Sequence, residues 1–469
     1  MESEKAFEYF KEISKIPRMP DYMGKISKYI YEFGRSLGLE TYVDAAENVV
    51  IKKPGTAGKM QASPIMLQAH MDMVCEKSDD LEHNFLEDPI QLIITDQIVT
   101  ADRTTLGADD GVGVAYIMGI LASDDITHPP VEALFTTNEE TDMRGAEYFS
   151  MEKCKAELII NLDAEAVTIS GCGEMETKIV LSKEKIKNMN HASAYKIAVG
   201  GMVGGHSGLD ATKERGNPIV LLARILNALF TQKNAFRFIG IKGGAGMSSA
   251  IPRQAECEIL CDADEEKILK IIRQEQENIV SEYGNKNPLM FVRVEKTDNI
   301  PVEVFSDSTT QKLINLLMVL PDGVSSRVDE DPDYMGNCYN IGSIGEGENE
   351  IVILGLIRGY TQYKKEILKN KIKILCNLIG CQMIITRDVP NWECRKNQHI
   401  RECVEQVYGK KTKRMDATTE CGYFLRQKES CVALGLGIPV YNMHSPDEYF
   451  EQKDFEEYWI KLKELLGKL

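Results

Sequence analysis

The amino-acid sequence predicts an α/β protein, in which a domain with a mostly parallel sheet is interrupted by an inserted α+β domain. Three observations lead to this fold class. Over the first third of the chain, short apolar runs alternate with helical stretches, which is typical of parallel sheets with helices on both faces. From about Met175 strand-like runs follow one another more densely, and the alternating pattern returns after Pro390. The chain also has 469 residues, more than one ordinary core accommodates.

In the first part of the chain, the expected elements follow from the spacing of apolar residues. Residues 22–37 place Ile26, Tyr29, Ile30 and Phe33 on one face of a helix. In a parallel sheet of this type, sites form where the carboxyl ends of the strands meet. Strands are expected at 48–53, 63–70, 131–137 and 156–163, and a helix from Gly111 to Leu121.

The middle of the chain contains enough elements for a complete α+β domain. We therefore expect a first domain in two parts, 1–184 and 391–469, with the inserted domain at 185–390. The last part is expected to contain a helix at 399–409, a strand at 429–435 and a helix at 455–469. In the middle, strands are expected at 175–182, 194–202, 237–244, 255–262, 289–296 and 350–359, and helices near 215–230, 265–283, 308–320 and 361–379.

Charge and composition restrict the partners and the compartment. The net charge is −17, and an acidic surface repels phosphate backbones and anionic lipid, so neither nucleic acid nor a membrane is an expected partner. The 12 cysteines form no CxxC pair, and several lie in apolar runs as buried free thiols do. The first 17 residues have no apolar stretch of the kind found in secretory signals. These observations predict a cytoplasmic protein.

His70 and Asp72 form an H-x-D motif at the end of the expected strand 63–70. Side chains two residues apart on a strand point to the same face. One of the pair can therefore bind a metal ion while the other orients the imidazole ring. A purely structural role for the pair is the alternative.

Asp109 lies in a glycine-rich segment before a helix. Gly107, Gly111 and Gly113 allow a tight turn that can present a carboxylate to two cations at once. A phosphate-binding loop is the competing interpretation, but no GK[ST] follows, and the adjacent Asp110 would add to the repulsion of phosphate. A helix N-cap is the simpler alternative role for one of these aspartates.

Further candidate ligands also follow apolar runs. Glu139 and Glu140 end the expected strand at 131–137, and adjacent residues of an extended chain face opposite ways, so one can bind a metal ion while the other reaches a water molecule. Asp163 ends the strand 156–163, and His444 precedes Ser-Pro-Asp-Glu. Each residue alone also fits a turn, a cap or a solvated acidic pair. Together they predict a hydrolase with two metal ions and a shared carboxylate.

These residues resemble the motifs of the co-catalytic di-zinc metallopeptidases, a family of aminoacylases, carboxypeptidase G and bacterial dipeptidases, and among them the aminoacyl-histidine dipeptidases. The resemblance covers nearly the whole chain. The segments LQAHMDMVCEK and GGHSG together are quite specific to it. The similar segments are 12–18, 67–77, 104–115, 139–140, 161–165, 204–208, 250–253, 420–422 and 444–448.

The resemblance implies a metallo-dipeptidase with two divalent ions, most simply zinc, with manganese and cobalt as alternatives. A hydroxide between the ions would attack the peptide bond of a dipeptide, of the Xaa-His type if the nearest resemblance holds. The inserted domain would act as a lid and form a homodimer. The implied metal ligands are His70, Asp163, Glu140, His444 and the bridging Asp109.

Further roles are implied for residues that do not bind metal. Glu139 would be the general base, and Asp72 would orient His70. His206 in GGHSG would polarise the scissile carbonyl group, within its own chain or across a dimer. Arg358 would bind the substrate carboxylate, and Asn340 would contact the substrate from the lid.

The chain departs from the family pattern at several positions near these motifs; the metal ligands and the base are kept, whereas the lid and substrate positions are not all kept. An aminoacylase, a deacetylase or a tripeptidase with the same site remains an alternative, and so does a catalytically silent metal-binding relative. A nucleotide-binding enzyme is disfavoured because the glycine-rich segment lacks the full fingerprint. The departures are Asn138, Asp142, Ser249, Asp416, Gly359 and Tyr360.

Overall fold

The computed structural model describes residues 3–188, 192–231, 236–298, 300–395 and 397–469. It divides the chain into two compact units. Unit 1 comprises Met1–Gly171 and Trp392–Leu469, and unit 2 comprises Cys172–Asn391. Within the described ranges, no helix combines the length and the apolar character that crossing a membrane requires.

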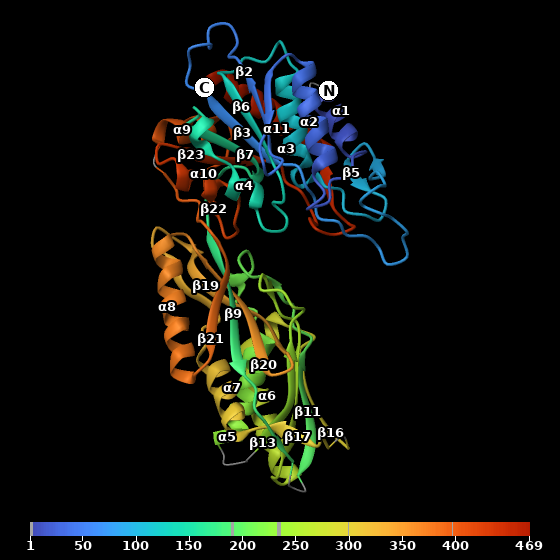
Figure 1. Ribbon diagram of the computed structural model, residues 1–469, viewed down its shortest axis with the longest axis vertical. Helices are drawn as coiled ribbons and strands as arrows, with labels where there is room; N and C mark the ends of the chain where they lie inside the picture. Colours follow the sequence, from blue (N-terminus) through green and yellow to red (C-terminus); the bar gives the residue numbers. More distant parts are fainter. Residues whose placement is uncertain (1–2, 189–191, 232–235, 299, 396) are drawn as a thin grey trace. The chain divides into compact units, whose positions relative to one another are not determined.

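Unit 1 is built on a mixed sheet whose central strands, β6, β3, β7 and β23, are parallel (Figure 1). Every residue of β3 and β6 is buried, as expected for parallel strands covered on both faces. The carboxyl ends of these strands therefore meet at one edge. The order of the sheet is β1 (Glu40–Val43), β2 (Val49–Lys53), β6 (Val131–Thr136), β3 (Ile65–His70), β7 (Leu158–Glu165), β23 (Val432–Gly437), β8 (Thr168–Gly171) and β22 (Lys413–Met415).

The helix after the glycine-rich segment packs directly on the central strands of unit 1. This helix, α3, contacts β3 and β7 and is almost entirely buried. Gly119 lets Trp459 of the last helix approach, because a Cβ at Gly119 would lie 2.8 Å from the indole ring. The helices of unit 1 are α1 (Glu4–Ile13), α2 (Gly24–Ser36), α3 (Ala108–Leu121), α4 (Arg144–Tyr148), α9 (Gln398–Tyr408), α10 (Cys421–Gln427) and α11 (Gln452–Lys468).

A small antiparallel sheet in unit 1 was not expected from the sequence. Its strands are β4 (Leu92–Ile94), β5 (Ile98–Ala101) and β24 (Tyr449–Glu451), and the central β5 joins two parts of the chain that are far apart in sequence. The three strands are too short to show a clear alternation of apolar and polar residues. β24 follows the turn that carries His444, so this sheet helps to place that turn.

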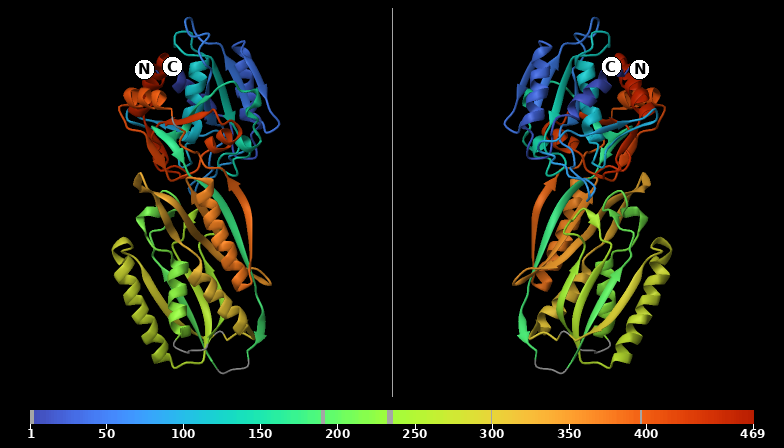
Figure 2. Two further views of the ribbon diagram at one scale, coloured as in Figure 1. Left: turned by 90° about the vertical axis from the view of Figure 1, so that its left-hand side faces the viewer. Right: turned by 90° about the vertical axis from the view of Figure 1, so that its right-hand side faces the viewer.

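Unit 2 is an antiparallel sheet covered by four long helices, which lie side by side in Figure 2. The strands are, in order across the sheet, β16 (Phe291–Thr297), β11 (Ser193–Gly200), β15 (Ala255–Cys261), β13 (Phe236–Gly243), β19 (Asp331–Glu346), β20 (Glu350–Gly359), β9 (Gly173–Ser182) and β21 (Gln382–Val389). The long helices are α5 (Pro218–Thr231), α6 (Glu265–Tyr283), α7 (Asp307–Val319) and α8 (Gln362–Ile379).

Strand β19 was missed by the sequence analysis, although it is central to unit 2. It contains glycines and asparagines, which lower the strand propensity of the segment. Tertiary packing overrides this preference, because β19 pairs with β13, β18 (Gly323–Val328) and β20. Gly355 on β20 leaves room for Tyr339, whose hydroxyl would lie 2.1 Å from a Cβ at that position.

The prediction of the fold class is confirmed, since a mostly parallel α/β unit is interrupted by a separate α+β unit. The division between the units lies at Gly171–Cys172 and at Asn391–Trp392. β9, which ends just before residue 184, belongs to unit 2 because it pairs with β20 and β21 there.

Candidate active site

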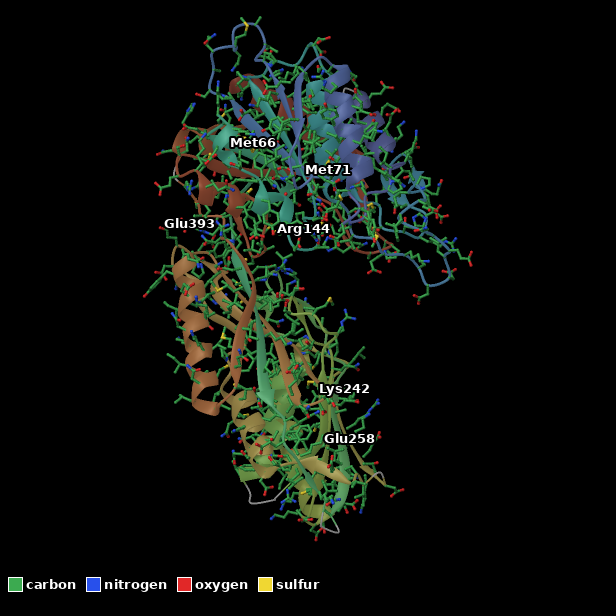
Figure 3. The ribbon with its side chains drawn as sticks, in the orientation of Figure 1. Met66, Met71, Arg144, Lys242, Glu258 and Glu393 are labelled. Carbon is green, nitrogen blue, oxygen red and sulfur yellow. The ribbon has the colours of Figure 1, made fainter. Side chains whose placement is uncertain are left out.

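The carboxyl ends of the parallel strands of unit 1 bring the first candidate residues together. β3 and β7 pair in register with Gln68 opposite Asn161, so His70 and Asp163 follow two residues further along each strand. His70 also pairs with Thr136 at the end of β6, three residues before Glu139. Figure 3 shows Met66 on β3 and Met71 just beyond its end, which locates this edge of the sheet.

Asp109 lies at the centre of the cluster, with one carboxylate oxygen facing each of two imidazole rings. Its Oδ1 is 3.1 Å from Nε2 of His70, and its Oδ2 is 3.3 Å from Nε2 of His444. His70 is fully buried, whereas the side chain of His444 is 51% exposed. A carboxylate placed between two nitrogen donors in this way has the geometry of a ligand shared by two cations.

Glu140 and Asp163 complete the cluster around Asp109. Oε1 of Glu140 lies 3.2 Å from Nε2 of His444, but its orientation does not give a hydrogen bond, and this buried oxygen has no hydrogen-bond partner. The carboxyl group of Asp163 lies close enough to those of Asp109 and Glu140 for their charges to raise its pKa. The structure therefore brings all five predicted ligands together.

The donor set fits divalent metal ions. Ligand atoms of His70, Asp109 and Glu140 all lie within 4.8 Å of one another, and the nitrogen and oxygen donors suit zinc and related ions. A buried carboxylate oxygen without a hydrogen bond, such as Oε1 of Glu140, is costly unless a cation satisfies it. The candidate metal centre is thus supported by its geometry as well as by its residue types.

Asp72 supports the cluster in two ways. Its carboxylate oxygens accept the backbone N–H groups of Glu139 and Glu140 at 3.1 and 3.0 Å, which holds the turn that carries both glutamates. Its backbone carbonyl lies 3.1 Å from Nδ1 of His70, closer than its carboxylate at 3.6 Å. A proton on Nδ1 would be donated to this carbonyl, which leaves the lone pair of Nε2 for a metal ion.

Without a cation, the carboxylates and imidazoles of the site hold protons, as their pKa values show. The nearby carboxylates of Asp109 and Glu140 outweigh burial and raise the pKa of His444 to about 11. Burial and the nearby carboxylate of Asp109 raise the pKa of Asp163 to about 7. Burial, with Asp163 and Glu140 nearby, raises the pKa of Glu139 well above its usual range. Metal ions that bind here must displace protons, so their affinity falls as the pH falls.

Glu448, which was not predicted as a site residue, fixes the segment that carries Asp109. Its buried carboxylate accepts the backbone N–H groups of Leu106, Gly107 and Ala108 at 2.8, 2.9 and 2.8 Å, and that of Asp109 at 3.3 Å. Gly107 has a φ of +68°, which allows these N–H groups to converge on one carboxylate. The only sequence signal for Glu448 was its place in the HSPDE motif.

We expect Glu448→Gln to weaken metal binding about 10- to 100-fold, because an amide cannot accept all four N–H groups and the turn that carries Asp109 will shift. Metal titration of the purified variant measures this loss, and circular dichroism reports on the fold. The neighbouring exposed residue gives a matched control, Asp447→Asn, which should bind metal as the original chain does. Equal metal affinity in both variants would show that Glu448 does not position the site.

Arg18 connects the segments that carry the first two predicted ligands. Its buried guanidinium group donates to the backbone carbonyls of Met71 and Asp72 at 3.1 Å and to that of Gly107. A Cβ at Gly107 would lie 2.3 Å from the same guanidinium group. Arg18 belongs to the EISKIPR segment, but no local pattern indicated what its side chain would contact.

Beneath the ligands, Glu420 ends a chain of buried hydrogen bonds. Nε2 of Gln68 and the hydroxyl of Thr136 each donate to Oε2 of Glu420 at 2.6 Å, and Asn161 donates to Gln68 at 2.7 Å. Asn161 also accepts the N–H of Ala164 at 2.7 Å, which fixes the backbone next to Asp163. Burial raises the pKa of Glu420 to about 8. The network ties the ends of β3, β6 and β7 together.

The predicted residues of unit 2 form a separate group around Arg358. The guanidinium group of Arg358 is buried and binds the carboxylate of Glu174 at 2.9 Å, and Glu174 also binds Arg387. Arg358 donates to the hydroxyl of Ser207 at 3.2 Å, and another of its nitrogens lies 3.3 Å from Nε2 of His206.

His206 has a defined tautomer in this group. Its Nδ1 accepts the backbone N–H groups of Gly208 and Leu209 at 3.2 and 2.9 Å, so the neutral ring carries its proton on Nε2. Both Nε2 of His206 and the nearby nitrogen of Arg358 are then donors, and two donors this close suit a shared oxygen acceptor. Asn340, in contrast, donates to the carbonyls of Ser248 and Ala250 at 2.7 and 2.8 Å, and so fixes the backbone.

Two of the departures from the motif pattern have clear local roles. Oδ1 of Asn138 accepts the N–H of Asp21 at 2.6 Å, next to the paired glutamates. Asp142 accepts from Nε of Arg144 at 2.9 Å, and Arg144 also binds Asp21. These residues stabilise the loop that carries Glu139 and Glu140 without entering the metal cluster.

Comparison with known proteins shows similarity over the whole chain. Residues 66–466 match the family described as Peptidase family M20/M25/M40. The cytosol non-specific dipeptidase of Escherichia coli (strain K12) is 30% identical over 475 aligned positions, which cover 99% of this chain and 97% of that protein.

Solved structures also show similarity over the whole chain. The aminoacylhistidine dipeptidase from Vibrio alginolyticus superposes with a TM-score of 0.86 at 29% identity, covering 99% of this chain and 96% of that one. The aminopeptidase PepT from Bacillus cereus superposes with a TM-score of 0.57 at 13% identity, covering 99% and 98% of the two chains. At this lower identity, the likeness shows the fold alone.

Proposed function

Because this chain belongs to peptidase family M20/M25/M40, we propose that it is a dipeptidase that requires two divalent metal ions, most simply zinc. One observation carries the proposal: the two carboxylate oxygens of Asp109 face His70 and His444 separately. The full-length similarity to a dipeptidase of E. coli and to one of V. alginolyticus supports the substrate class.

We assign the ligands to two ions that share one carboxylate. His70 and Asp163 would hold one ion, Glu140 and His444 would hold the other, and Asp109 would contribute one oxygen to each. The chemistry that such ions supply when bound is a lowered pKa of water and a polarised carbonyl group. Asp72 and Glu448 keep the ligand turns in place.

Glu139 is the proposed general base. It lies beside the ligand Glu140, and its backbone N–H is held by Asp72 at 3.1 Å. In the proposed reaction, Glu139 takes a proton from the attacking water and delivers it to the leaving amine.

His206 and Arg358 are proposed to act on the substrate as donors. The Nε2–H of His206 can donate to the developing oxyanion of the scissile carbonyl group. Arg358 can bind the substrate carboxylate, and Glu174 fixes its guanidinium group. Asn340 is proposed to support this group through the backbone it holds.

We expect His206→Asn to lower kcat by about 10²–10³ with little change in KM, because a donor to the oxyanion acts in the transition state. Steady-state kinetics on a dipeptide measures both constants. His399→Asn, which changes an exposed histidine on α9, is the matched control and should be fully active. A change in KM alone for the His206 variant would make it a binding residue instead.

A substrate panel tests the proposed function itself. Protein stripped of metal by a chelator is refilled with zinc, manganese or cobalt, and is assayed with β-alanyl-histidine, several Xaa-His and Xaa-Leu dipeptides, a tripeptide and N-acetylated amino acids. We expect metal-dependent hydrolysis of free dipeptides. Faster turnover of the acetylated substrates would identify an aminoacylase, and metal binding without turnover of any substrate would identify a silent relative.

Two further parts of the proposal concern location and assembly. We propose a cytoplasmic location, supported by the cytosolic name of the E. coli relative and by 12 free cysteines in the structure. We also propose a homodimer formed through unit 2, which rests on the family resemblance. Analytical ultracentrifugation of the full chain tests the dimer, and a monomer at all concentrations would exclude it.

A further inference from the structure

Helix α8 of unit 2 ends in a turn that holds Cys376 and Cys381 together. The backbone N–H groups of Gly380 and Cys381 both donate to the carbonyl of Cys376 at 2.9 Å, and Gly380 has a φ of +83°. The bond from Cys381 is the 6→1 bond of a Schellman motif, in which the side chains of the residue four before the left-handed glycine and of the residue after it frequently touch. Both of these positions are cysteines here.

The thiol of Cys381 lies against the backbone of Cys376. This thiol donates to the backbone oxygen of Cys376, with Sγ 3.5 Å from that oxygen. With a backbone hydrogen bond of this length, standard bond lengths keep the two Cα atoms no more than about 6.8 Å apart. Disulfides typically span roughly 4.4–6.8 Å between Cα atoms.

Cys376 and Cys381 differ in their exposure and in the acidity of their thiols. Cys376 is 1% exposed and packs in the core of unit 2, whereas Cys381 is partly exposed at the start of β21. The neighbouring thiol of Cys376 and the nearby ammonium group of Lys312 lower the pKa of Cys381. In comparison, burial raises the pKa of the partly exposed Cys75 to about 11. A reagent from solvent therefore meets Cys381 first, and meets it as the more acidic thiol of the pair.

We propose that Cys376 and Cys381 are a reversible oxidation site, at which a hydroperoxide converts the adjacent thiols into an intramolecular disulfide. The thiolate of Cys381 attacks the peroxide, the O–O bond breaks, and Cys381 becomes a sulfenic acid as an alcohol or water leaves. The sulfur of Cys376 then attacks the sulfenic sulfur, loses its proton and releases water. Two thiols are oxidised and one peroxide is reduced. This site does not depend on the proposed peptidase function.

The crosslink would join the end of α8 to the beginning of β21. These two elements pack against each other, and α8 also contacts β9 and β20, so the disulfide forms inside an assembled part of unit 2. A six-residue segment whose ends already touch needs little rearrangement. Reduction by a cellular thiol would restore the pair.

Peptide mass spectrometry of the full-length protein tests the site directly. Both cysteines fall in one tryptic peptide, residues 374–387, between Lys373 and Arg387. After graded hydrogen peroxide and alkylation of the remaining thiols, we expect this peptide to be lighter by two hydrogens and free of alkyl groups. The change should reverse with a reductant and should occur at lower peroxide doses than oxidation of the exposed Cys394. A peptide that stays doubly alkylated after Cys394 is oxidised would refute the proposal.

Two variants separate the roles of the thiols. Cys376→Ser removes the resolving thiol, so Cys381 should accumulate as a sulfenic acid that dimedone traps and should then over-oxidise. Cys394→Ser is the matched control and should form the disulfide as the original chain does. If Cys381 in the Cys376 variant resists peroxide as well as Cys75 does, it is not the reactive thiol and the proposal fails. The experiment on the original chain remains decisive if a variant does not fold.

Discussion

Replacing Glu139 by glutamine is expected to lower kcat by roughly 10²–10⁴ while the fold and the metal content stay unchanged. Glutamine has nearly the same shape as glutamate and keeps the backbone N–H that Asp72 accepts. It cannot take a proton from water, so the proton-transfer role is lost. Glu139 is not one of the five proposed metal ligands, so the ions should remain bound.

The decisive measurement is kcat on a free dipeptide together with the number of metal ions per chain. Glu147→Gln, on the exposed side of the neighbouring helix α4, is the matched control and should keep full activity. Full activity in the Glu139 variant would eliminate it as the base. Loss of metal together with activity would instead make Glu139 a ligand.

Replacing Asp109 by asparagine is expected to abolish activity, with a loss of more than about 10³ in kcat/KM, and to remove at least one ion per chain. Asparagine presents one oxygen and one NH₂ group in place of two anionic oxygens. The NH₂ group cannot bind a cation. Either the ion bound by His70 or the ion bound by His444 would therefore lose its ligand from residue 109.

Elemental analysis of the dialysed protein measures the metal loss, and calorimetric titration with zinc measures the remaining affinity. Asp124→Asn, an exposed change just after α3, is the matched control and should retain the original metal content. An Asp109 variant that still holds two ions tightly would show that this carboxylate does not bridge them, and would require a different arrangement of ligands.

Much of the fold could be predicted because its elements have regular apolar patterns. Strands β3, β6 and β7 and helices α5, α6 and α8 appeared close to their expected ranges. The strands that were not predicted include β19, which is rich in glycine and asparagine, and the short β4, β5 and β24. These strands exist because neighbouring strands pair with them, and a local sequence pattern does not record distant partners.

The candidate ligands could also be named from the sequence, since residues of suitable chemistry follow apolar strands. The arrangement of these ligands in space could not be predicted from the sequence. Arg18, Glu420 and Glu448 were missed as supporting residues because their side chains bind backbone or buried groups that lie far away in sequence. Glu448, for example, accepts an N–H group 341 residues away at Gly107.

By itself, the sequence determined the fold class, the chemistry of the proposed metal ligands and the family resemblance, because strand and helix periodicity and short motifs are local properties. The tertiary structure alone decided which oxygen of Asp109 faces which imidazole, which ring nitrogen of His206 carries the proton, and which backbone oxygen the thiol of Cys381 contacts. His444 and Asp109 are 335 residues apart, and they meet only after folding. Protonation then depends on the burial and the hydrogen bonds that this contact creates.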